Sequence, residues 1–212
     1  MKRTQRGLSL IELLTVVAII GILATILLPY TLNRLEDSKI AKMEQEISSL
    51  MSATALFYND NSTIPNIWND FVTPPTGFTN WRGPYINKAP NPGSTALWTA
   101  ASVWKTDYRI HRLVGATTDH RFGSITNLYP LRNALALEIT NPLAGTSPII
   151  PLTSLQRIDT DIDNNNAGSG FIIEANANTT PFITGGSMGG LTTTAAYAGG
   201  GKSVYVLLFT YY

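Results

Sequence analysis

One carboxylate stands at the start of the most apolar stretch of this chain. Glu12 is followed by 21 residues, 13–33, that carry no charged side chain. About 20 apolar residues in a helix, which rises about 1.5 Å per residue, span the hydrocarbon core of a bilayer. A carboxylate in such a segment is costly to place in lipid, so by default it is a functional group with a cationic partner. The chemistry expected at Glu12 is therefore ion pairing in a medium of low dielectric constant.

Three aspartates at alternate positions form a second candidate site. Asp159, Asp161 and Asp163 could direct three carboxylates at one hard cation such as calcium. The pattern departs from a calcium-binding EF-hand loop, because Asn164 replaces the turn glycine and Gly170 stands where the closing glutamate should be. The alternative is a turn rich in Asp and Asn that leads into a strand. Calcium is thus the one candidate cofactor that the sequence suggests.

The remaining side chains form no recognisable catalytic arrangement. The chain has two histidines, His111 and His120, and no cysteine. Neither histidine has the partners of a metal site, and the glycines before Lys202 lack the spacing of a phosphate-binding loop. We therefore expect no enzymatic activity, and a fold held without disulfides.

One cluster of basic residues could in principle bind nucleic acid through phosphate contacts. Its members are Lys105, Arg109, His111, Arg112 and Arg121. The formal net charge of the chain is +1, however, and without Lys2, Arg3 and Arg6 there are 12 basic and 14 acidic residues. A solvated face is the favoured interpretation, and a nucleic-acid partner is not expected.

The N-terminal flank predicts the orientation of the apolar segment. Residues 1–6 carry three basic residues and no acid, so the N-terminus should remain cytoplasmic while the rest is exported. A cleavable signal should end in a small-x-small site, but the run exits through Leu-Leu-Pro-Tyr at 27–30. A plain anchor leaves Glu12 unexplained. The third possibility is a cut at Gly7 that leaves the whole run on the mature chain.

A single long helix is predicted over residues 8–58. Its first part, 8–30, is apolar throughout, and its second part is amphipathic. One face of the second part repeats at steps of three, four and seven, through Ile40, Met43, Ile47, Leu50 and Phe57. This change predicts a membrane segment followed by a segment that packs on a globular domain.

The rest of the chain, residues 59–212, reads as one β-rich domain. Its strand-like runs are 103–110, 134–139, 170–174 and 203–210. Roughly 150 residues can bury one core, and an antiparallel sheet on the amphipathic half of the helix is the simplest arrangement. The predicted fold class is therefore α+β, with a long N-terminal helix packed on a C-terminal antiparallel sheet.

The N-terminal run also resembles a known family. Residues 7–29, which begin Gly-Leu-Ser-Leu-Ile-Glu, resemble the signature of type IV prepilins and type II secretion pseudopilins. The positions that carry the resemblance are Gly7, Glu12, Gly21 and Pro29. Leu8 stands where the family usually has Phe, and Ser9 where Thr is commoner. More weakly, residues 81–86 resemble the Gly-Pro-Tyr segment of some pseudopilins, which would be a subunit-packing loop or a proline-stiffened surface loop.

The resemblance implies a processing and assembly route. A membrane prepilin peptidase would remove the cytoplasmic leader 1–7 by cutting between Gly7 and Leu8, whose new amino group is methylated. Glu12 of one subunit would then neutralise that amine on the next, although pairing with its own N-terminus is the alternative. Between Gly21 and Pro29 the helix would either melt on packing or keep a static kink.

The function that the resemblance implies is structural. The chain would be a single-pass inner-membrane prepilin, surrounded by lipid, that joins copies of itself and minor pilins at an inner-membrane assembly platform. The product would be a periplasmic or extracellular filament, either a pilus or a secretion pseudopilus. Two alternatives remain: a minor tip pilin or adhesin that acts as a binding module, and a signal-anchored periplasmic domain without a filament role.

Overall fold

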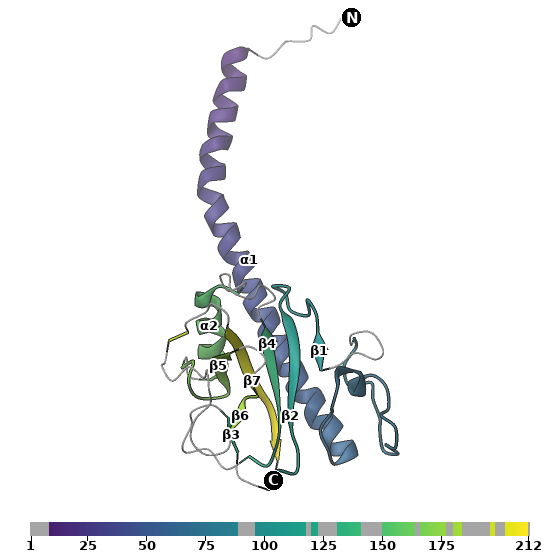
Figure 1. The fold of residues 1–212 in the computed structure, drawn as a ribbon. Coiled ribbons are helices and arrows are strands. Elements are labelled where there is room, and N and C mark those ends of the chain that lie inside the picture. Colours follow the sequence, from purple (N-terminus) through teal and green to yellow (C-terminus); the bar gives the residue numbers. More distant parts are fainter. Residues whose placement is uncertain are drawn as a thin grey trace, which may run out of the picture. The chain divides into compact units, whose positions relative to one another are not determined.

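The computed structural model describes residues 9–88, 96–117, 120–122, 131–140, 150–163, 166–176, 180–183, 196–197 and 202–211. The chain forms two compact units, residues 1–39 and residues 40–212. Figure 1 traces the elements in sequence order, and they are α1 (Leu10–Asn61), η1 (Trp68–Phe71), β1 (Leu97–Trp98), β2 (Asp107–Leu113), β3 (Arg121–Phe122), β4 (Asn133–Thr140), α2 (Leu152–Ile162), β5 (Ile172–Asn176), β6 (Phe182–Ile183) and β7 (Lys202–Tyr211).

The first unit consists of the apolar part of α1. The large apolar side chains along it from Leu10 to Leu35 are 50–81% exposed. An 18-residue stretch of α1 reaches a mean hydropathy of 2.7, so this helix is long and apolar enough to cross a membrane. The prediction of an apolar helix that precedes an amphipathic one is confirmed, with helical bounds of Leu10–Asn61.

The second unit is built around the amphipathic part of α1. All five residues of the predicted apolar face are buried there, together with Ala53 and Thr54. They pack in one core with the sheet residues Ile110, Leu137 and Val206. Because the side chains of a strand alternate between its two faces, these residues define the helix face of the sheet.

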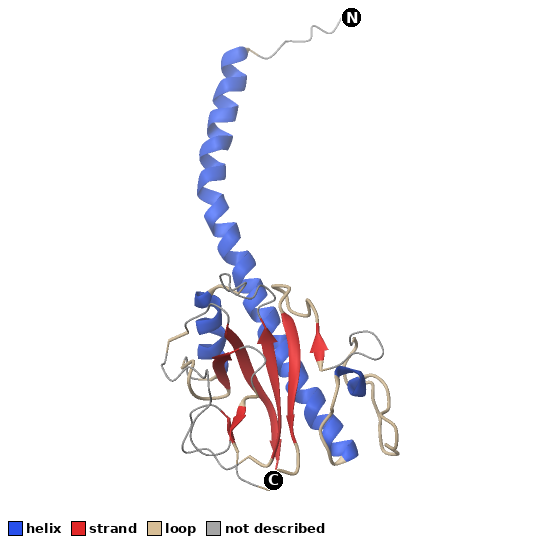
Figure 2. Cartoon of the chain, in the orientation of Figure 1, coloured by secondary structure: helices blue, strands red, loops and turns tan. Residues whose placement is uncertain are grey.

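The main sheet has five antiparallel strands in the order β1-β2-β4-β7-β5. Figure 2 shows these strands in red with the lower part of α1 behind them. The opposite, outer face of the sheet carries a smaller core that includes Ala136, Ile173 and Tyr205. Phe122 and Phe182, from the two-stranded β3–β6 pair, pack into that core. The predicted fold class, α+β with a long helix on an antiparallel sheet, is confirmed.

The strand predicted at residues 170–174 is β5, two residues later, and η1, β1, β3 and β6 were not predicted. Two further differences have a local cause. The strand predicted from residue 103 begins at Asp107, because residues 102–106 form a turn in which the hydroxyls of Ser102 and Thr106 lie 2.6 Å apart. The Ser102 hydroxyl also accepts the backbone N–H of Thr106, which is the local bonding that competes with a strand. The second difference is α2, which occupies a segment where the sequence suggested only an Asp-rich turn.

Candidate functional site

The first turn of α1 places Glu12 in a defined local role. Ser9 immediately precedes the helix, and its backbone N–H donates a hydrogen bond of 2.8 Å to Glu12 Oε2. The Ser9 carbonyl in turn accepts the backbone N–H of Glu12 at 3.1 Å. The Glu12 carboxylate thus makes one half of a capping box, because it satisfies an orphan N–H of the helix start, whereas the N–H of Glu12 is accepted by the Ser9 carbonyl and not by its hydroxyl. In the isolated subunit Glu12 is therefore exposed and bonded within its own chain.

The two residues of the expected processing site, Gly7 and Leu8, lie outside the described residues. Glu12 thus stands at the boundary of the described helix, one turn from the expected cut. The structure brings Glu12 to the backbone of Ser9, the residue directly after Leu8. Pairing of Glu12 with an amine at Leu8, in the same or a neighbouring subunit, stays a prediction.

Gly21 and Pro29 lie within an uninterrupted helix. Pro29 lacks the N–H that would bond the carbonyl of Thr25, and it remains inside α1. The Thr25 hydroxyl donates to the Gly21 carbonyl at 2.9 Å, and the Thr31 hydroxyl donates to the Leu28 carbonyl at 2.8 Å. These hydroxyl bonds lie on the same turns as the missing backbone bond. Melting of this segment on assembly stays a prediction.

A charged collar, residues 34–39, follows the apolar segment on α1. Two ion pairs at i,i+3 spacing, Arg34–Asp37 and Glu36–Lys39, each measure 3.8 Å. Arg34 also lies over the ring of Tyr30, 5.1 Å from its centroid, and donates to its hydroxyl at 3.0 Å. An aromatic ring with a polar end next to a basic residue suits a membrane–water boundary. The collar marks where the apolar surface of α1 ends.

The segment at residues 81–86 is tied to the end of α1. Tyr85 packs against Phe57 with ring centroids 5.4 Å apart, and its hydroxyl donates to Asp60 at 2.8 Å. The Trp81 indole N–H donates to the carbonyl of Asp70 at 3.0 Å. Burial raises the pKa of the Tyr85 phenol above its ordinary value. These contacts fix the segment on the globular unit, and a role in subunit packing remains a prediction.

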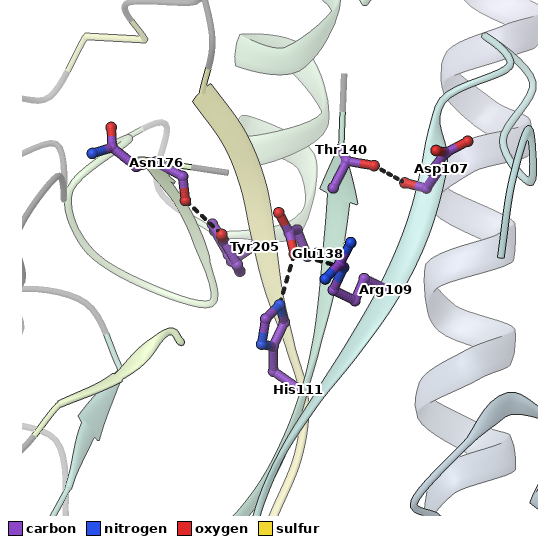
Figure 3. A network of polar contacts seen from close by, with 7 residues as sticks. All are labelled: Asp107, Arg109, His111, Glu138, Thr140, Asn176 and Tyr205. Atoms are coloured by element: carbon purple, nitrogen blue, oxygen red, sulfur yellow. Dashed lines mark hydrogen bonds and ion pairs between the residues drawn. The ribbon is translucent and has the colours of Figure 1, made fainter. Parts of the chain in front are cut away.

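A polar network lies on the outer face of the sheet, where it is shown in Figure 3. The register of β2, β4 and β7 places Arg109 opposite Glu138, and Glu138 opposite Tyr205. Glu138 is fully buried, 2.7 Å from His111 Nε2 and 3.6 Å from Arg109 Nε. Burying a carboxylate costs several kcal/mol unless partners of opposite charge compensate it. The positive charge of Arg109 therefore compensates the buried carboxylate of Glu138 within the domain.

The rest of the network in Figure 3 consists of neutral bonds that close the sheet. The Thr140 hydroxyl donates to the Asp107 carbonyl at 3.1 Å, and the Tyr205 hydroxyl donates to the Asn176 carbonyl at 2.7 Å.

The basic cluster predicted from the sequence is divided between the two faces of the sheet. Arg112 lies on the other face from His111 and donates to the Thr63 hydroxyl at 3.3 Å. The arrangement is that of a structural network, in which Arg109 Nε contributes an ion pair and no hydrogen bond.

The three aspartates proposed as cation ligands have separate partners. Asp159 is buried on α2 and accepts a hydrogen bond of 2.7 Å from the Tyr197 hydroxyl. Asp161 lies one turn from Arg157, at 4.0 Å. Asp163, after the end of α2, accepts the backbone N–H of Phe171. Among the described residues the structure finds no group of three metal-binding side chains, so it does not bring these carboxylates together at one point.

The helix α2 was missed, although its signal was present. Leu152, Leu155, Ile158 and Ile162 recur at steps of three, three and four, and Pro151 stands directly before the first turn. Because Asp159 lies on the buried side of this helix, Tyr197 is held to α2 by a bond to a charged acceptor. Burial and that hydrogen bond raise the pKa of the Tyr197 phenol above its ordinary value. In a chain without cysteine this contact fixes a late segment to the core.

Two carboxyl groups meet where α1 approaches α2. Burial, followed by hydrogen bonding to Asp161 and its negative charge, raises the pKa of Glu44 above its ordinary value of 4.5. Arg157 lowers it by a smaller amount. The pair therefore favours the protonated form of Glu44, and it makes this contact dependent on pH.

A small pocket opens between α1 and the β1–β2 edge of the sheet. It has a volume of about 170 Å³ and is lined by residues of α1, the segment that ends at Lys88, β1, β2 and Ala101. Two of its lining residues are joined by a hydrogen bond, in which the Tyr108 hydroxyl donates to Glu46 Oε2 at 2.8 Å. Burial and the charge of Glu46 raise the pKa of the Tyr108 phenol above its ordinary value. The pocket was not predicted, because its lining comes from four separate segments.

Comparison with known proteins agrees with this geometry. The prokaryotic N-terminal methylation motif matches residues 2–28. The type II secretion system core protein G of Pseudomonas aeruginosa is 31% identical over 96 residues, which are 42% of this chain and 68% of that protein. The same protein of Xanthomonas campestris is 31% identical over 81 residues, 38% of this chain and 57% of its own length. The type IV major fimbrial protein FimA of Dichelobacter nodosus is 43% identical over 53 residues, 25% of this chain and 34% of its length.

Motif, helix and sheet together define a type IV pilin-like protein. The chain belongs to the pilin-like family of the type II secretion system core protein G, and it is a structural subunit of a pilin-like filament. The predicted resemblance is confirmed. An apolar N-terminal helix in this family fits an inner-membrane anchor that later enters a filament.

Proposed function

We propose that this chain is the repeating subunit of a type II secretion pseudopilus. The observation that carries the proposal is the extent of similarity. The match to core protein G of Pseudomonas aeruginosa runs over 96 residues, which is more than the 52-residue helix α1 could supply. The match to the fimbrial protein covers 53 residues, a length that the N-terminal helix region alone would account for.

Processing would make the helix competent for assembly. A peptidase that cuts between Gly7 and Leu8 removes the basic leader and leaves the amine of Leu8 as the single cation before Arg34. Before the cut, Glu12 is bonded to the backbone N–H of Ser9. That bond is about the strength of a capping interaction, on the order of 1 kcal/mol. An amine presented by a neighbour in a lipid-like medium is a stronger partner for the carboxylate.

The physics of the bilayer explains why one charge can set the register. Apolar side chains of α1 that leave lipid for a bundle of helices gain no hydrophobic free energy, because lipid tails are as apolar as Leu. Association then depends on close packing and on polar bonds between helices. Glu12 is the one acidic residue before position 36. We infer that it selects the axial offset between subunits, and that the second unit coats the filament.

The first experiment determines the intact mass and N-terminal peptide of the membrane-extracted chain. A start at methylated Leu8 supports the proposal. A start at Met1, in cells with an active prepilin peptidase, would contradict it and favour a tethered periplasmic domain.

Two variants then separate the roles of Glu12. Glu12→Gln can keep the capping bond to Ser9 but lacks the charge, whereas Glu12→Ala loses both. If the charge sets the register, both variants abolish filaments seen by electron microscopy. If capping alone matters, Glu12→Gln assembles normally and our reasoning about the amine is wrong. A filament that forms without this protein but fails to attach to its target would favour the tip-pilin alternative.

A further inference from the structure

The pocket beside β1 has the size and chemistry to take one aromatic side chain. Its volume of about 170 Å³ is close to that of engineered apolar cavities of about 150 Å³, which hold a benzene ring. Its walls are mainly apolar, with Glu46 and Lys88 as the charged members. The apolar residues that line it are Leu50, Ile86, Trp98 and Ala101.

The same unit presents one phenyl ring to solvent. Phe171 is 46% exposed, and it is the aromatic residue among the large apolar side chains exposed in the part of residues 40–212 that the structure describes. Its backbone is held on both sides: the N–H donates to the carboxylate of Asp163, and the carbonyl accepts the N–H of Leu207 at 2.8 Å. The backbone that carries the ring is therefore held in place before binding, which lowers the entropic cost of presenting the ring to a partner.

The ring and the pocket lie at opposite edges of one sheet. Phe171 directly precedes β5, the last strand in the order β1-β2-β4-β7-β5, whereas the pocket lies beside β1 and β2. Four inter-strand spacings of about 4.8 Å separate the two edge strands by about 19 Å. One copy cannot place its own ring in its own pocket, so the occupant must come from another chain.

Each feature has a charged side chain of opposite sign beside it, Asp163 at the ring and Lys88 at the pocket, and the pocket's other charged residue, Glu46, accepts the Tyr108 hydroxyl. The carboxylate of Asp163 lies against the backbone of Phe171. The exposed ammonium group of Lys88 lies at the pocket. A ring inserted from a second copy would bring this acid towards this base. Opposite charges around an aromatic anchor favour the correct orientation of two partners.

We propose that Phe171 of one copy inserts into the pocket of the next, which makes the two sheet edges the lateral contact between subunits. The contact is head-to-tail, because each copy uses a ring on one side and a pocket on the other. A head-to-tail contact forms a ring only if the rotation between successive subunits adds up to a full turn. Otherwise it generates an open helical assembly. The proposal rests on the proposed filament function, for which it names the contact between the globular units.

The absence of cysteine gives the test a clean background. In the full-length chain, Ser49→Cys marks the pocket and Ser169→Cys marks the ring, while Phe171 itself is kept. Both changes are nearly isosteric. Membranes and sheared filaments are treated with a short bis-maleimide and separated on denaturing gels. A head-to-tail contact is expected to give a ladder of dimers, trimers and longer products, whereas each single-cysteine chain can give dimers at most.

A second substitution in the double-cysteine chain shows whether the ring makes the contact. Phe171→Ala is expected to lower the cross-linked fraction about tenfold, as for an aromatic anchor. Val114→Ala, at a residue that is 43% exposed, is the matched control and should leave the ladder intact. Filaments that form with no ladder, or a ladder that Phe171→Ala leaves unchanged, would overturn this contact but not the filament function. A ladder that depends on Phe171 in cells that make no filaments would support the contact and contradict the proposed function.

Discussion

The packing of α1 on the sheet can be tested with two isomeric side chains on one helix. Ile47 is 2% exposed in the core, whereas Leu56 is 57% exposed nine residues further along the helix. Ile47→Ala and Leu56→Ala each replace a four-carbon side chain with a methyl group. If the buried face of α1 holds the globular unit together, the two changes should have very different effects on its stability.

The expected difference follows from burial. Replacing a buried Ile with Ala costs about 2–5 kcal/mol, the lost transfer free energy plus a cavity contribution. For Ile47 we expect about 3 kcal/mol. In a unit of this size each kcal/mol lowers the melting temperature by about 2–4 °C, so the expected shift is about 6–12 °C. Leu56→Ala should change stability by less than about 0.5 kcal/mol, because an exposed Leu has little packing to lose and Ala is a better helix former.

Tryptophan fluorescence is a suitable probe, since all four tryptophans lie in the second unit at positions 68, 81, 98 and 104. Urea and thermal unfolding of the detergent-solubilised full-length chain would report on that unit, even though α1 continues into the micelle. Equal losses for the two variants would refute the assignment of the buried face. A loss for Ile47→Ala below about 1 kcal/mol would show that the sheet does not depend on this helix.

Three further variants test individual contacts by the same fluorescence assay. Glu44→Gln is expected to stabilise the chain by about 0.5 kcal/mol at pH 7. Because the pKa of Glu44 is raised on folding, its protonated form favours the folded state: this contribution is fully present below the unfolded pKa of 4.5 and is lost as the pH rises through the folded pKa. The stability gained by Glu44→Gln should therefore shrink as the pH falls towards 4. Tyr197→Phe should cost about 1.5–3 kcal/mol, because the buried Asp159 loses a donor. Gly83→Ala should cost about 1–3 kcal/mol, because a Cβ there would overlap the Trp81 ring.

Each of these variants has a result that would contradict it. If Glu44→Gln raised the free energy of unfolding equally from pH 4 to pH 7, the pair of Glu44 and Asp161 could not be the cause. Tyr205→Phe is the control for Tyr197→Phe: its hydroxyl donates to the neutral carbonyl of Asn176, so its loss should be about 1 kcal/mol. Equal losses for the two tyrosines would exclude the charge of Asp159 as the source of the difference. An unchanged unfolding curve for Gly83→Ala would mean that the indole ring moves freely.

The sequence predicted the elements whose pattern is local and repeated. The apolar face of α1 followed from helical spacing, and all five of its predicted residues are buried. The strand at residues 203–210 differs from β7 by one residue at each end, because a run of branched and aromatic residues has few alternatives. The turn at residues 102–106 was read as strand because Val103 and Trp104 are apolar, and the hydroxyl bonds that bend the chain there have no periodic signature.

The candidate sites were harder to predict, because their geometry depends on distant segments. Glu12 was found through its cost in an apolar run, and its capping bond is encoded within four residues. The alternation of Asp159, Asp161 and Asp163 suggested one cation, but on a helix alternate residues point about 200° apart. The contact between Asp159 and Tyr197 joins residues 38 positions apart, so no local sequence pattern predicts it.

The strand order has a consequence for how this protein can be made. β7 comes last among the strands in sequence, yet it lies between β4 and β5 and supplies the pairing of both. A chain that emerges N-terminus first therefore completes α1 while its sheet still lacks the strand that joins β4 to β5. Until residues 202–211 have been synthesised, β5 has no neighbour in the main sheet, so the sheet is completed only at the end of synthesis. A nascent chain that stalls before residue 202 would therefore leave unpaired the edges of β4 and β5 that β7 covers, which exposes it to aggregation and proteolysis.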